Sequence, residues 1–410
     1  MHDSTTSPER PRVAVIGVGA MGSMAMWRLA LAGFDVTGFE RFGVPHDRGA
    51  HGGETRIYRM AYREGEDYIP LLRFSHSRWQ ELGAASGRSL FIQNGCLYIS
   101  DGTRPWLAET VAATQVHGIP IIELTDSDLA ARYPQHRLEG GESAILDLYG
   151  GTLRPEQAVL AAAQQAVALG ATLREYTPVT ALDATDTGVT VRTGDGEPER
   201  FDYAVVTSGA WTGEFQRSLG FGITARRLPG TWYPAVDPRE FQPDRFPVVI
   251  RSAGDLDYSG FPCVDGWSVK VMPPVFPDTE TVAEETDREI RPRDIAYTRT
   301  VVQRLLNGLV DRPARTGVYL DGFAATDKPV IDYAPGARRV VGAVGFAGHG
   351  FKYSPAVGQL LTDLIATEAG LPTSPLLDAA APFTRDAVPT ASDFLRTRIT
   401  TPTTEEKDNA

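Results

Sequence analysis

Three glycines near the start of the chain have the spacing of a nucleotide-binding turn. Gly17, Gly19 and Gly22 directly follow an apolar run, residues 13–16, which predicts a buried parallel strand that turns sharply into a helix. In such a turn the first glycine permits the bend, the second lets a pyrophosphate approach the backbone, and the third lets the helix pack on the strand. The positive end of the helix then faces the phosphate groups.

An acid at the end of the next predicted strand narrows the choice of nucleotide. Glu40 follows residues 35–39, where a carboxylate accepts hydrogen bonds from ribose hydroxyls and repels a 2′-phosphate, so FAD or NAD is favoured over NADP. A glycine-rich turn without a ligand is the alternative, but here the strand, glycines, helix and acid stand in register. The residues expected to hold the nucleotide are Gly17, Gly19, Ala20, Met21, Gly22, Glu40 and Arg41.

Basic side chains form the second group that could do chemistry. Arg56, Arg59 and Arg63 are spaced i, i+3, i+7, which places them near one face if the segment is helical. By spacing alone, a solvated basic stripe explains them better than a site does. Lys270 lies in an apolar run, residues 268–271, and is either a fixed cation that stabilises developing negative charge or an edge-strand lysine.

A second glycine-rich turn lies toward the other end of the chain. Residues 345–350 follow the apolar run 340–344 and precede a helix that is predicted to begin at Ser354. Backbone N–H groups and the dipole at such a helix start stabilise negative charge. A turn without a ligand explains the glycines but leaves Lys352, which follows them, unexplained.

Two kinds of secondary-structure pattern in the sequence must position the glycine turns and the basic side chains. Helices are predicted over residues 20–32 and 155–169, and strands over residues 172–176, 188–192 and 201–207. Two stretches rich in β-branched and aromatic residues predict a mostly antiparallel sheet, with strands at residues 91–92, 95–99, 231–233, 248–250 and 268–271. We expect an α/β protein with a nucleotide-binding domain (11–87, 146–221, 319–387), an interleaved substrate domain (88–145, 222–318) and tails at 1–10 and 388–410. The substrate site then lies at the seam between the domains.

Composition restricts the class of protein. The 410 residues are 42% hydrophobic and 22% charged, which is ordinary for a globular protein, and the net charge of −12 argues against a nucleic acid or an anionic membrane as partner. Cys96 and Cys263 have no paired spacing, so neither a disulfide framework nor a metal site is expected. The first ten residues have no apolar core and no stretch is long enough to span a bilayer, so we predict a cytoplasmic protein.

Taken in order, these motifs resemble the monomeric sarcosine oxidase group of FAD-dependent amine oxidases, in the D-amino-acid-oxidase-like superfamily. That group includes N-methyltryptophan oxidase and the fructosyl-amino-acid oxidases. The resemblance runs from residue 13 to residue 366, and its anchors are residues 17–22, 53–59, 202–211, 268–270 and 345–352. It implies a Rossmann-like FAD domain of the glutathione-reductase type, with the antiparallel sheet as the substrate domain.

The resemblance also implies roles for single residues. In the family, the residues that match Arg59 and Lys352 hold the substrate carboxylate, the one that matches Arg56 lies near the flavin, and the one that matches Lys270 serves oxygen chemistry. Tyr258 and Met272 are expected as substrate-pocket walls, with Trp232 and Phe276 as further candidates. The FAD contacts implied beyond the first turn are Arg56, Val179, Ser208, Gly209, Trp211, Gly345, Gly348, His349, Gly350, Phe351 and Lys352.

Two positions depart from the family pattern. Tyr319 is the best match to the cysteine that binds flavin covalently in sarcosine oxidase, so FAD is expected to bind noncovalently. Four residues beyond Lys270, Pro274 stands where sarcosine oxidase has an active-site histidine. A rigid apolar ring there predicts a pocket more apolar than one for N-methylglycine.

The hypothesis that follows is an FAD-dependent oxidase of a secondary or N-substituted amino acid. The C–N bond would be oxidised to an imine by hydride transfer to the flavin, and O2 would become hydrogen peroxide, with Arg56, Arg59, Lys270 and Lys352 as catalytic residues. One alternative is a dehydrogenase, or a tailoring oxidoreductase of secondary metabolism, that uses another electron acceptor, and a weaker one is a catalytically silent FAD-binding subunit. An NAD-linked dehydrogenase would leave the second glycine-rich turn and Lys352 unexplained.

Overall fold

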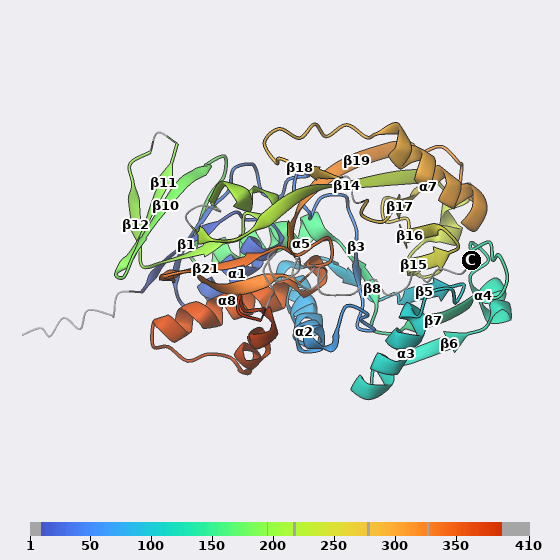
Figure 1. The fold of residues 1–410 in the computed structure, drawn as a ribbon, viewed down its shortest axis with the longest axis horizontal. Coiled ribbons are helices and arrows are strands. Elements are labelled where there is room, and N and C mark those ends of the chain that lie inside the picture. Colours follow the sequence, from blue (N-terminus) through green and yellow to red (C-terminus); the bar gives the residue numbers. More distant parts are fainter. Residues whose placement is uncertain (1–9, 195, 216–218, 277–278, 326–327, 388–410) are drawn as a thin grey trace, which may run out of the picture.

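The computed structural model describes residues 10–194, 196–215, 219–276, 279–325 and 328–387. The predicted tails at residues 1–10 and 388–410 lie outside this part of the chain, except for Arg10. Figure 1 shows two bodies side by side, a parallel sheet with its helices and a larger, mostly antiparallel sheet. Among the described helices, none combines the length and the hydrophobicity that a membrane crossing requires.

The first body is built on a six-stranded sheet in the order β20-β21-β13-β1-β2-β9. All of its pairs are parallel except β20 with β21, and the central strands β1 and β13 are nearly continuous apolar runs because both faces are covered. The strands predicted at residues 13–16, 35–39, 172–176, 201–207 and 340–344 all contribute to this sheet. The strands are β1 (Arg12–Ile16), β2 (Asp35–Phe39), β9 (Thr172–Arg174), β13 (Tyr203–Val206), β20 (Val330–Ala334) and β21 (Ala337–Val344).

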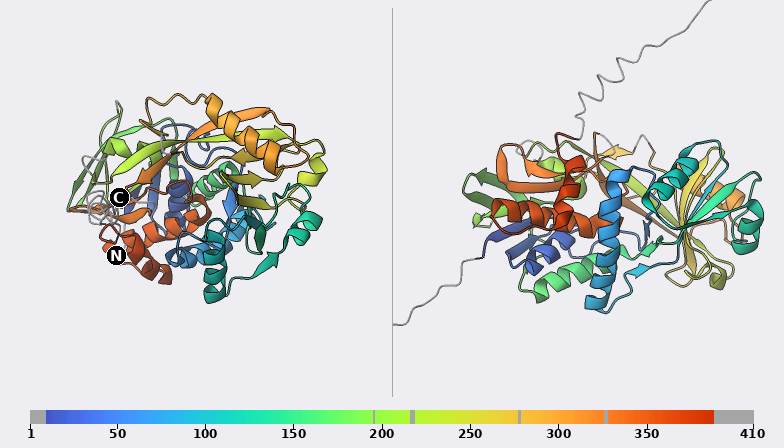
Figure 2. Two further views of the ribbon diagram at one scale, coloured as in Figure 1. Left: turned by 45° about the vertical axis from the view of Figure 1, so that its right-hand side comes forward. Right: turned by 90° about the horizontal axis from the view of Figure 1, so that it is seen from below.

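Helices cover one face of this sheet and a small sheet covers the other. The helices α1 (Ala20–Leu31), α5 (Pro155–Ala168), α8 (Ser354–Glu368) and α2 (Ile69–Ser86) pack on one another below it, as the right-hand view of Figure 2 shows. A Cβ on Gly358 would lie 2.6 Å from the backbone of Met24, so α8 approaches α1 closely. The opposite face packs on β10 (Val179–Thr185), β11 (Gly188–Thr193) and β12 (Glu199–Phe201).

The second body is a nine-stranded sheet that is antiparallel except where β15 pairs with β5, which confirms the prediction of a mostly antiparallel sheet. Helix α7 (Pro292–Leu305) packs on one face through Val301 and Leu305, and the other face looks toward the first body. The strands are β5 (Cys96–Ser100), β6 (Ile121–Leu124), β7 (Ser143–Asp147), β14 (Ile223–Pro234), β15 (Val248–Ala253), β16 (Leu256–Phe261), β17 (Ser268–Met272), β18 (Glu280–Thr281) and β19 (Arg315–Ala324).

Residues 91–92 differ from the expectation. They form β4 (Phe91–Ile92) and pair with β8 (Gly151–Leu153) in a separate three-stranded sheet with β3 (Arg56–Tyr58), not in the large sheet. A two-residue strand carries too little pattern to indicate its partner. Among the described residues, further α-helices are α3 (Trp106–His117) and α4 (Asp126–Arg132). Short 3₁₀ helices lie at Glu66–Tyr68, Gly209–Phe215, Pro238–Phe241, Phe351–Tyr353 and Pro375–Phe383.

Two long paired strands, β14 and β19, cross from one body to the other along the top of Figure 1. The far end of β19 reaches the second glycine-rich turn, where Phe323 bridges to Phe346 and a Cβ on Gly345 would lie 2.6 Å from that of Ala324. The boundary expected between residues 318 and 319 falls within β19. The domain boundaries remain predictions, while the ribbon of β14 and β19 holds the two bodies around a shared space.

Candidate active site

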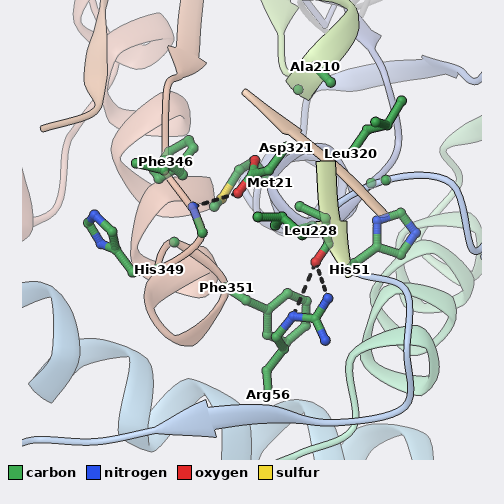
Figure 3. Close-up of a pocket in the computed structure, with 18 of the residues that line it drawn as sticks. Met21, His51, Arg56, Ala210, Leu228, Leu320, Asp321, Phe346, His349 and Phe351 are labelled. Carbon is green, nitrogen blue, oxygen red and sulfur yellow. Dashed lines mark hydrogen bonds between the residues drawn. The ribbon is translucent and has the colours of Figure 1, made fainter. Parts of the chain in front are cut away.

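A cavity of about 760 Å³ lies where the two bodies meet. Gly17, Gly19 and Glu40 of the first body line one end. Arg59 of the loop after β3, Lys352 of the turn before α8, and residues of the antiparallel sheet such as Phe261 and Met272 line the remainder. Figure 3 shows part of it, with Met21 of α1, Arg56 of β3 and the turn at Phe346–Phe351 converging from three segments that are distant in the sequence. The cavity is long and chemically different at its two ends.

The first glycine turn lies at one end of the cavity, which we call the nucleotide end. Gly17 has φ +85° and donates its N–H to the carbonyl of Phe39 at 2.9 Å, which closes the bend between strand and helix. A Cβ on Gly22 would lie 1.8 Å from the oxygen of Gly17, so Gly22 serves the close packing of α1 and stands outside the cavity wall. The start of α1 therefore presents bare backbone to the cavity.

Glu40 is buried at the same end. Its carboxylate accepts hydrogen bonds from the N–H of Val18 at 2.8 Å and of Phe42 at 3.0 Å, which fix its position, while burial raises its pKa. An acceptor held in this way suits ribose hydroxyls.

Two histidines that the sequence analysis missed line the nucleotide end. His51 is 3% exposed, its ring lies 4.7 Å from that of His46, and its Nε2 has no hydrogen-bond partner among the described residues. Burial lowers the pKa of His46 to about 4 and holds that of His51 well below its ordinary value, so both rings are neutral at pH 7. They lie in the loop after β2, where no periodic pattern or motif marks a contact.

The second glycine turn meets a carboxylate from β19. Asp321 accepts the N–H of Gly348 at 2.7 Å and the N–H of Gly322 at 2.8 Å, and burial raises its pKa to about 6. Figure 3 shows the bond between Asp321 and the turn. Leu320 and Asp321 line the cavity, whereas Tyr319 lies outside the wall, where it packs against Trp232 and against Leu228, which is itself a lining residue. The residue of β19 singled out from the sequence is therefore one or two positions away from those that face the cavity.

The first pair of cations lies in the cavity wall at the opposite end. Arg59 and Lys352 are 5% and 4% exposed. Arg59 forms an ion pair with Glu64, its Nη1 has no hydrogen-bond partner among the described residues, and Lys352 donates to the carbonyl of His349. Although burial alone would raise the pKa of Glu64, Arg59 and Lys352 lower it to about 2. Burial, and then Arg59, hold the pKa of Lys352 well below its ordinary value.

The second pair of cations, Arg56 and Lys270, is bound to backbone carbonyls. Arg56 donates to Gly52 at 2.5 Å and to Thr55 at 2.6 Å, as well as to Ala50. Lys270 donates to the carbonyls of Gly53 and Thr55, both at 2.8 Å. Its Nζ lies 4.2 Å from the ring centroid of Phe261, which lines the cavity, so Lys270 stands one layer behind the wall. Burial, and then Arg56, lower its pKa well below the ordinary value.

The segment that contains Arg56, Arg59 and Arg63 is not helical, so the helical spacing considered for the three arginines does not apply. Arg56 begins the strand β3, and Arg59 and Arg63 follow in a loop, because residues 56–58 pair with β8. Arg63 stands at the cavity with a side chain that is 41% exposed. The i, i+3, i+7 spacing therefore does not explain why Arg56 and Arg59 face the cavity.

Only some of the residues predicted as substrate-side walls line the cavity. Met272 and Pro274 line the cavity, but Tyr258 lies in the core on the opposite face of the sheet, with its hydroxyl 3.4 Å from Nδ1 of His136. Successive side chains of a strand point to opposite faces, so Ser259 and Phe261 of β16 line the cavity instead of Tyr258. Trp232 and Phe276 also lie outside the wall, whereas Ile57, Trp106 and Ile250, which the sequence analysis missed, belong to it.

Most of the predicted cofactor contacts are brought together. Besides Gly22, Gly345 lies outside the wall and serves the close approach of its turn to β19. The predicted cofactor residues that line the cavity are Gly17, Gly19, Ala20, Met21, Glu40, Arg41, Arg56, Val179, Ser208, Gly209, Trp211, Gly348, His349, Gly350, Phe351 and Lys352. A helix start with exposed N–H groups, a buried acceptor for ribose and a long cavity fit an adenine dinucleotide such as FAD.

Comparisons with known proteins agree with this geometry. The model of the family described as FAD dependent oxidoreductase matches residues 12–364. Monomeric sarcosine oxidase from Bacillus sp. (strain B-0618) is 29% identical over 362 residues, which cover 87% of this chain and 92% of that protein. N-methyl-L-tryptophan oxidase from Yersinia pestis (strain Pestoides F) is 28% identical over 353 residues, which cover 84% of this chain and 92% of that protein.

Solved structures support the fold alone, because their sequence identities are low. NikD, an unusual amino acid oxidase essential for nikkomycin biosynthesis, has a TM-score of 0.80 at 22% identity and covers 92% of this chain and 98% of its own. Glycine oxidase from Geobacillus kaustophilus has a TM-score of 0.73 at 18% identity and covers 92% of this chain and 99% of its own.

Proposed function

We propose that this chain, which belongs to the FAD dependent oxidoreductase family, oxidises the C–N bond of a secondary or N-substituted amino acid and passes the electrons to O2. The substrate loses a hydride and a proton to become an imine, and O2 takes up two electrons and two protons to become hydrogen peroxide. The observation that carries the proposal is the pair of buried cations, Arg59 and Lys352, in the wall of the cavity that contains the nucleotide turn. The family and the α/β fold expected from the motifs are confirmed.

FAD is the cofactor of this family, and when bound it supplies the acceptor for the two electrons of the C–N bond. The backbone at Gly17 and Gly19 and the carboxylate of Glu40 would hold its nucleotide part, and the turn that contains Gly348 would hold its ring. Noncovalent binding belongs to the proposal: Cys96 and Cys263 are buried outside the cavity wall. Acid precipitation should therefore leave the yellow colour in the supernatant, and colour in the protein pellet would contradict noncovalent binding.

Arg59 and Lys352 would bind the substrate carboxylate. A planar guanidinium and a compact ammonium in one buried wall suit a carboxylate, because the first binds in a bidentate manner and the second adds a point charge. Glu64 now pairs with Arg59, and a carboxylate substrate would take over that interaction. Nη1 of Arg59, which has no hydrogen-bond partner among the described residues, is a further donor for it.

The same two cations would favour the reactive form of the amine. A third positive charge beside Arg59 and Lys352 is disfavoured, so the pKa of a bound amine falls and the neutral form, whose lone pair is needed, predominates. No protein base is then required. The wall residues Met272, Pro274 and Ile250 are apolar and exclude water from the C–N bond, which favours a substrate larger and less polar than N-methylglycine.

Lys270 would serve the reaction with O2. Electron transfer to O2 places a localised negative charge on a small molecule, and a fixed cation near the cavity stabilises that charge. The ammonium of Lys270 is buried and held by two carbonyls, which keeps it in place without a bound anion. The proposal also includes a cytoplasmic location for the protein.

One observation favours a second candidate, a dehydrogenase with another electron acceptor. Lys270 stands behind Phe261, outside the cavity wall, so its effect on O2 has to act across a layer of side chains. Turnover with an artificial acceptor in the absence of O2, together with slow turnover in air, would support this candidate.

A panel of amino acids tests the proposed function. In the absence of O2, the purified yellow protein is mixed with N-methyl, cyclic and primary amino acids, and bleaching of the visible band is followed. In air, the peroxide formed with the same amino acids is measured. We expect bleaching by secondary amino acids with apolar side chains and weak bleaching by the corresponding amines that lack a carboxylate. If no secondary amino acid bleaches the protein, the proposal is wrong.

A further inference from the structure

The carboxylate of Glu156, which the function proposed above does not use, binds the segment that holds Lys270. Glu156 is the second residue of α5 and reaches up to the loop before β3. Its Oε1 accepts the N–H of Gly53 at 2.6 Å, and both of its oxygens accept the N–H of Glu54, at 3.0 and 3.1 Å. Two successive backbone N–H groups thus converge on one carboxylate, which is the geometry of an anion-binding nest.

The backbone at this point has an unusual conformation that the carboxylate stabilises. Gly53 has φ +95° and Glu54 has φ +67°, and the N–H of Thr55 closes a short turn onto the carbonyl of Gly53 at 2.8 Å. A glutamate rarely adopts a left-handed φ without compensation from its surroundings. The three bonds from Glu156 supply that compensation.

The opposite side of the same turn carries the carbonyls that hold the cation. Gly53 donates its N–H to Glu156, and its carbonyl accepts the ammonium of Lys270 at 2.8 Å. The carbonyl of Thr55 accepts the second bond from Lys270 at 2.8 Å, and it also accepts Arg56. A change at Glu156 therefore reaches Lys270 through a single turn of backbone.

We infer that Glu156 is a positioning residue for Lys270, which orients the two carbonyls that bind the ammonium and supplies a negative charge that keeps it protonated. This inference rests on the oxygen role proposed for Lys270. Among the described residues, Glu156 does not line the cavity and forms no hydrogen bond or ion pair with Lys270, so it positions Lys270 through the turn at residues 53–55.

The charges that surround Lys270 are consistent with this role. Burial lowers the pKa of the Lys270 ammonium most, and Arg56 and Arg315 lower it further. Glu156 and Glu54 raise that pKa. Glu54 is already bound by Arg315 in an ion pair at 2.6 Å and by Nε1 of Trp232 at 3.1 Å. Glu156, in contrast, is bound by backbone N–H groups, and its charge acts on Arg56 as well as on Lys270.

The test compares Glu156→Gln with the wild type in the reaction with O2 alone. Each protein is reduced chemically with dithionite, mixed with O2, and its reoxidation is followed from pH 6 to pH 10. We expect reoxidation of Glu156→Gln to be slower by about tenfold, because one oriented charge is lost. Without the anion the pKa of Lys270 falls further, so the decline in rate at high pH should move to lower pH.

A second readout does not depend on turnover. Amide hydrogen exchange of the peptide that contains Gly53 and Glu54 should be faster in Glu156→Gln than in the wild type. Asp101→Asn is the matched control, since Asp101 accepts the N–H of Gly254 at 2.6 Å in a hairpin away from the cavity. We expect wild-type reoxidation and wild-type exchange at residues 53–54 in this control.

The outcomes separate this inference from the function on which it rests. Wild-type reoxidation and pH dependence in Glu156→Gln, with slow reoxidation in Lys270→Met, would overturn the role of Glu156. Wild-type reoxidation in Lys270→Met would overturn the oxygen role and this inference together, while bleaching by substrate would still support the proposed amine oxidation. If Glu156→Gln does not fold, Glu156→Asp keeps the charge with a shorter reach. Glu156→Asp should be reoxidised slowly, and its reoxidation rate should decline at nearly the same pH as that of the wild type. A wild-type reoxidation rate in this variant would overturn the inference.

Discussion

Two pairs of cations lie in or beside the same cavity, and each pair has one arginine and one lysine. Arg59 and Lys352 form the first pair, and Arg56 and Lys270 form the second. Arg59 is balanced by the side-chain carboxylate of Glu64, whereas Arg56 and Lys270 are bound to the backbone carbonyls of residues 50–55.

The difference indicates what each pair can do. A carboxylate partner can be replaced by another carboxylate, so the first pair can exchange Glu64 for a substrate. Backbone carbonyls are fixed by the fold and bring no net charge, so they hold the second pair in place without neutralising it. The first pair is therefore suited to binding an anion from solution, and the second to acting as a fixed electric field while Lys270 is protonated.

The largest effect is expected when the exchangeable pair loses its arginine. Arg59→Met should lower kcat/KM for an amino acid substrate by roughly a thousandfold, since breaking a buried charge pair costs about 3–5 kcal/mol. Steady-state kinetics with the best substrate of the panel measure it. Arg245→Met, on the surface, is the control. A decrease of less than threefold in Arg59→Met would show that this cation does not bind the carboxylate.

The next effect concerns the fixed pair. Lys270→Met should slow the reaction of the reduced protein with O2 by about a hundredfold, while anaerobic bleaching by substrate changes only a few-fold. Methionine keeps the length of the side chain and removes the charge. Stopped-flow measurement of the two half-reactions separates them, and an equal decrease in both would remove the distinction between the two pairs.

The pH dependence of anion binding sharpens the comparison. Since the pKa of Lys352 is lowered, its charge is lost as pH rises through that lowered value, and a carboxylate inhibitor should then bind more weakly, by up to about tenfold per pH unit. Spectral titration across pH measures this. In Lys352→Met the inhibitor should bind more weakly at pH 7, with little further change as pH rises. An unchanged slope in that variant would assign the titration to another group.

The smallest effect is expected from the displaced partner. Glu64→Gln should bind a carboxylate inhibitor roughly fivefold more tightly, because the charge that competes for Arg59 is absent. The pKa of Glu64, about 2, lies below its ordinary value of 4.5, so the carboxylate stabilises the folded protein above about pH 5 and progressively less as pH falls toward 2. The stability advantage of the wild type over Glu64→Gln in urea unfolding should shrink over that range. Weaker inhibitor binding in Glu64→Gln would show that Glu64 supports the anion site instead of competing for it.

Much of the fold could be predicted because it depends on local pattern. The glycine turn at Gly17–Gly22 needs bends and close approaches that other residues cannot provide, and a GxGxxG turn with Glu40 in register has few interpretations. The strand and helix at residues 337–368 likewise follow from continuous apolar runs and helical periodicity. These features predicted the nucleotide-binding sheet, and the stretches rich in β-branched and aromatic residues predicted the antiparallel one.

The partners of each side chain depended on contacts between distant segments. No local pattern indicates that Asp321 meets the turn at Gly348 or that Glu156 binds Gly53 across 103 residues. Distant contacts also decide which face of a strand points to the cavity. Tyr258 and Ser259 could each belong to the cavity wall, and only the packing of β16 against α7 shows that Ser259 does. Sequence alone determined the type of backbone and the kinds of charge in this protein. The tertiary structure decided which charges face the cavity and which groups hold them, because those energies arise from long-range burial and hydrogen bonding.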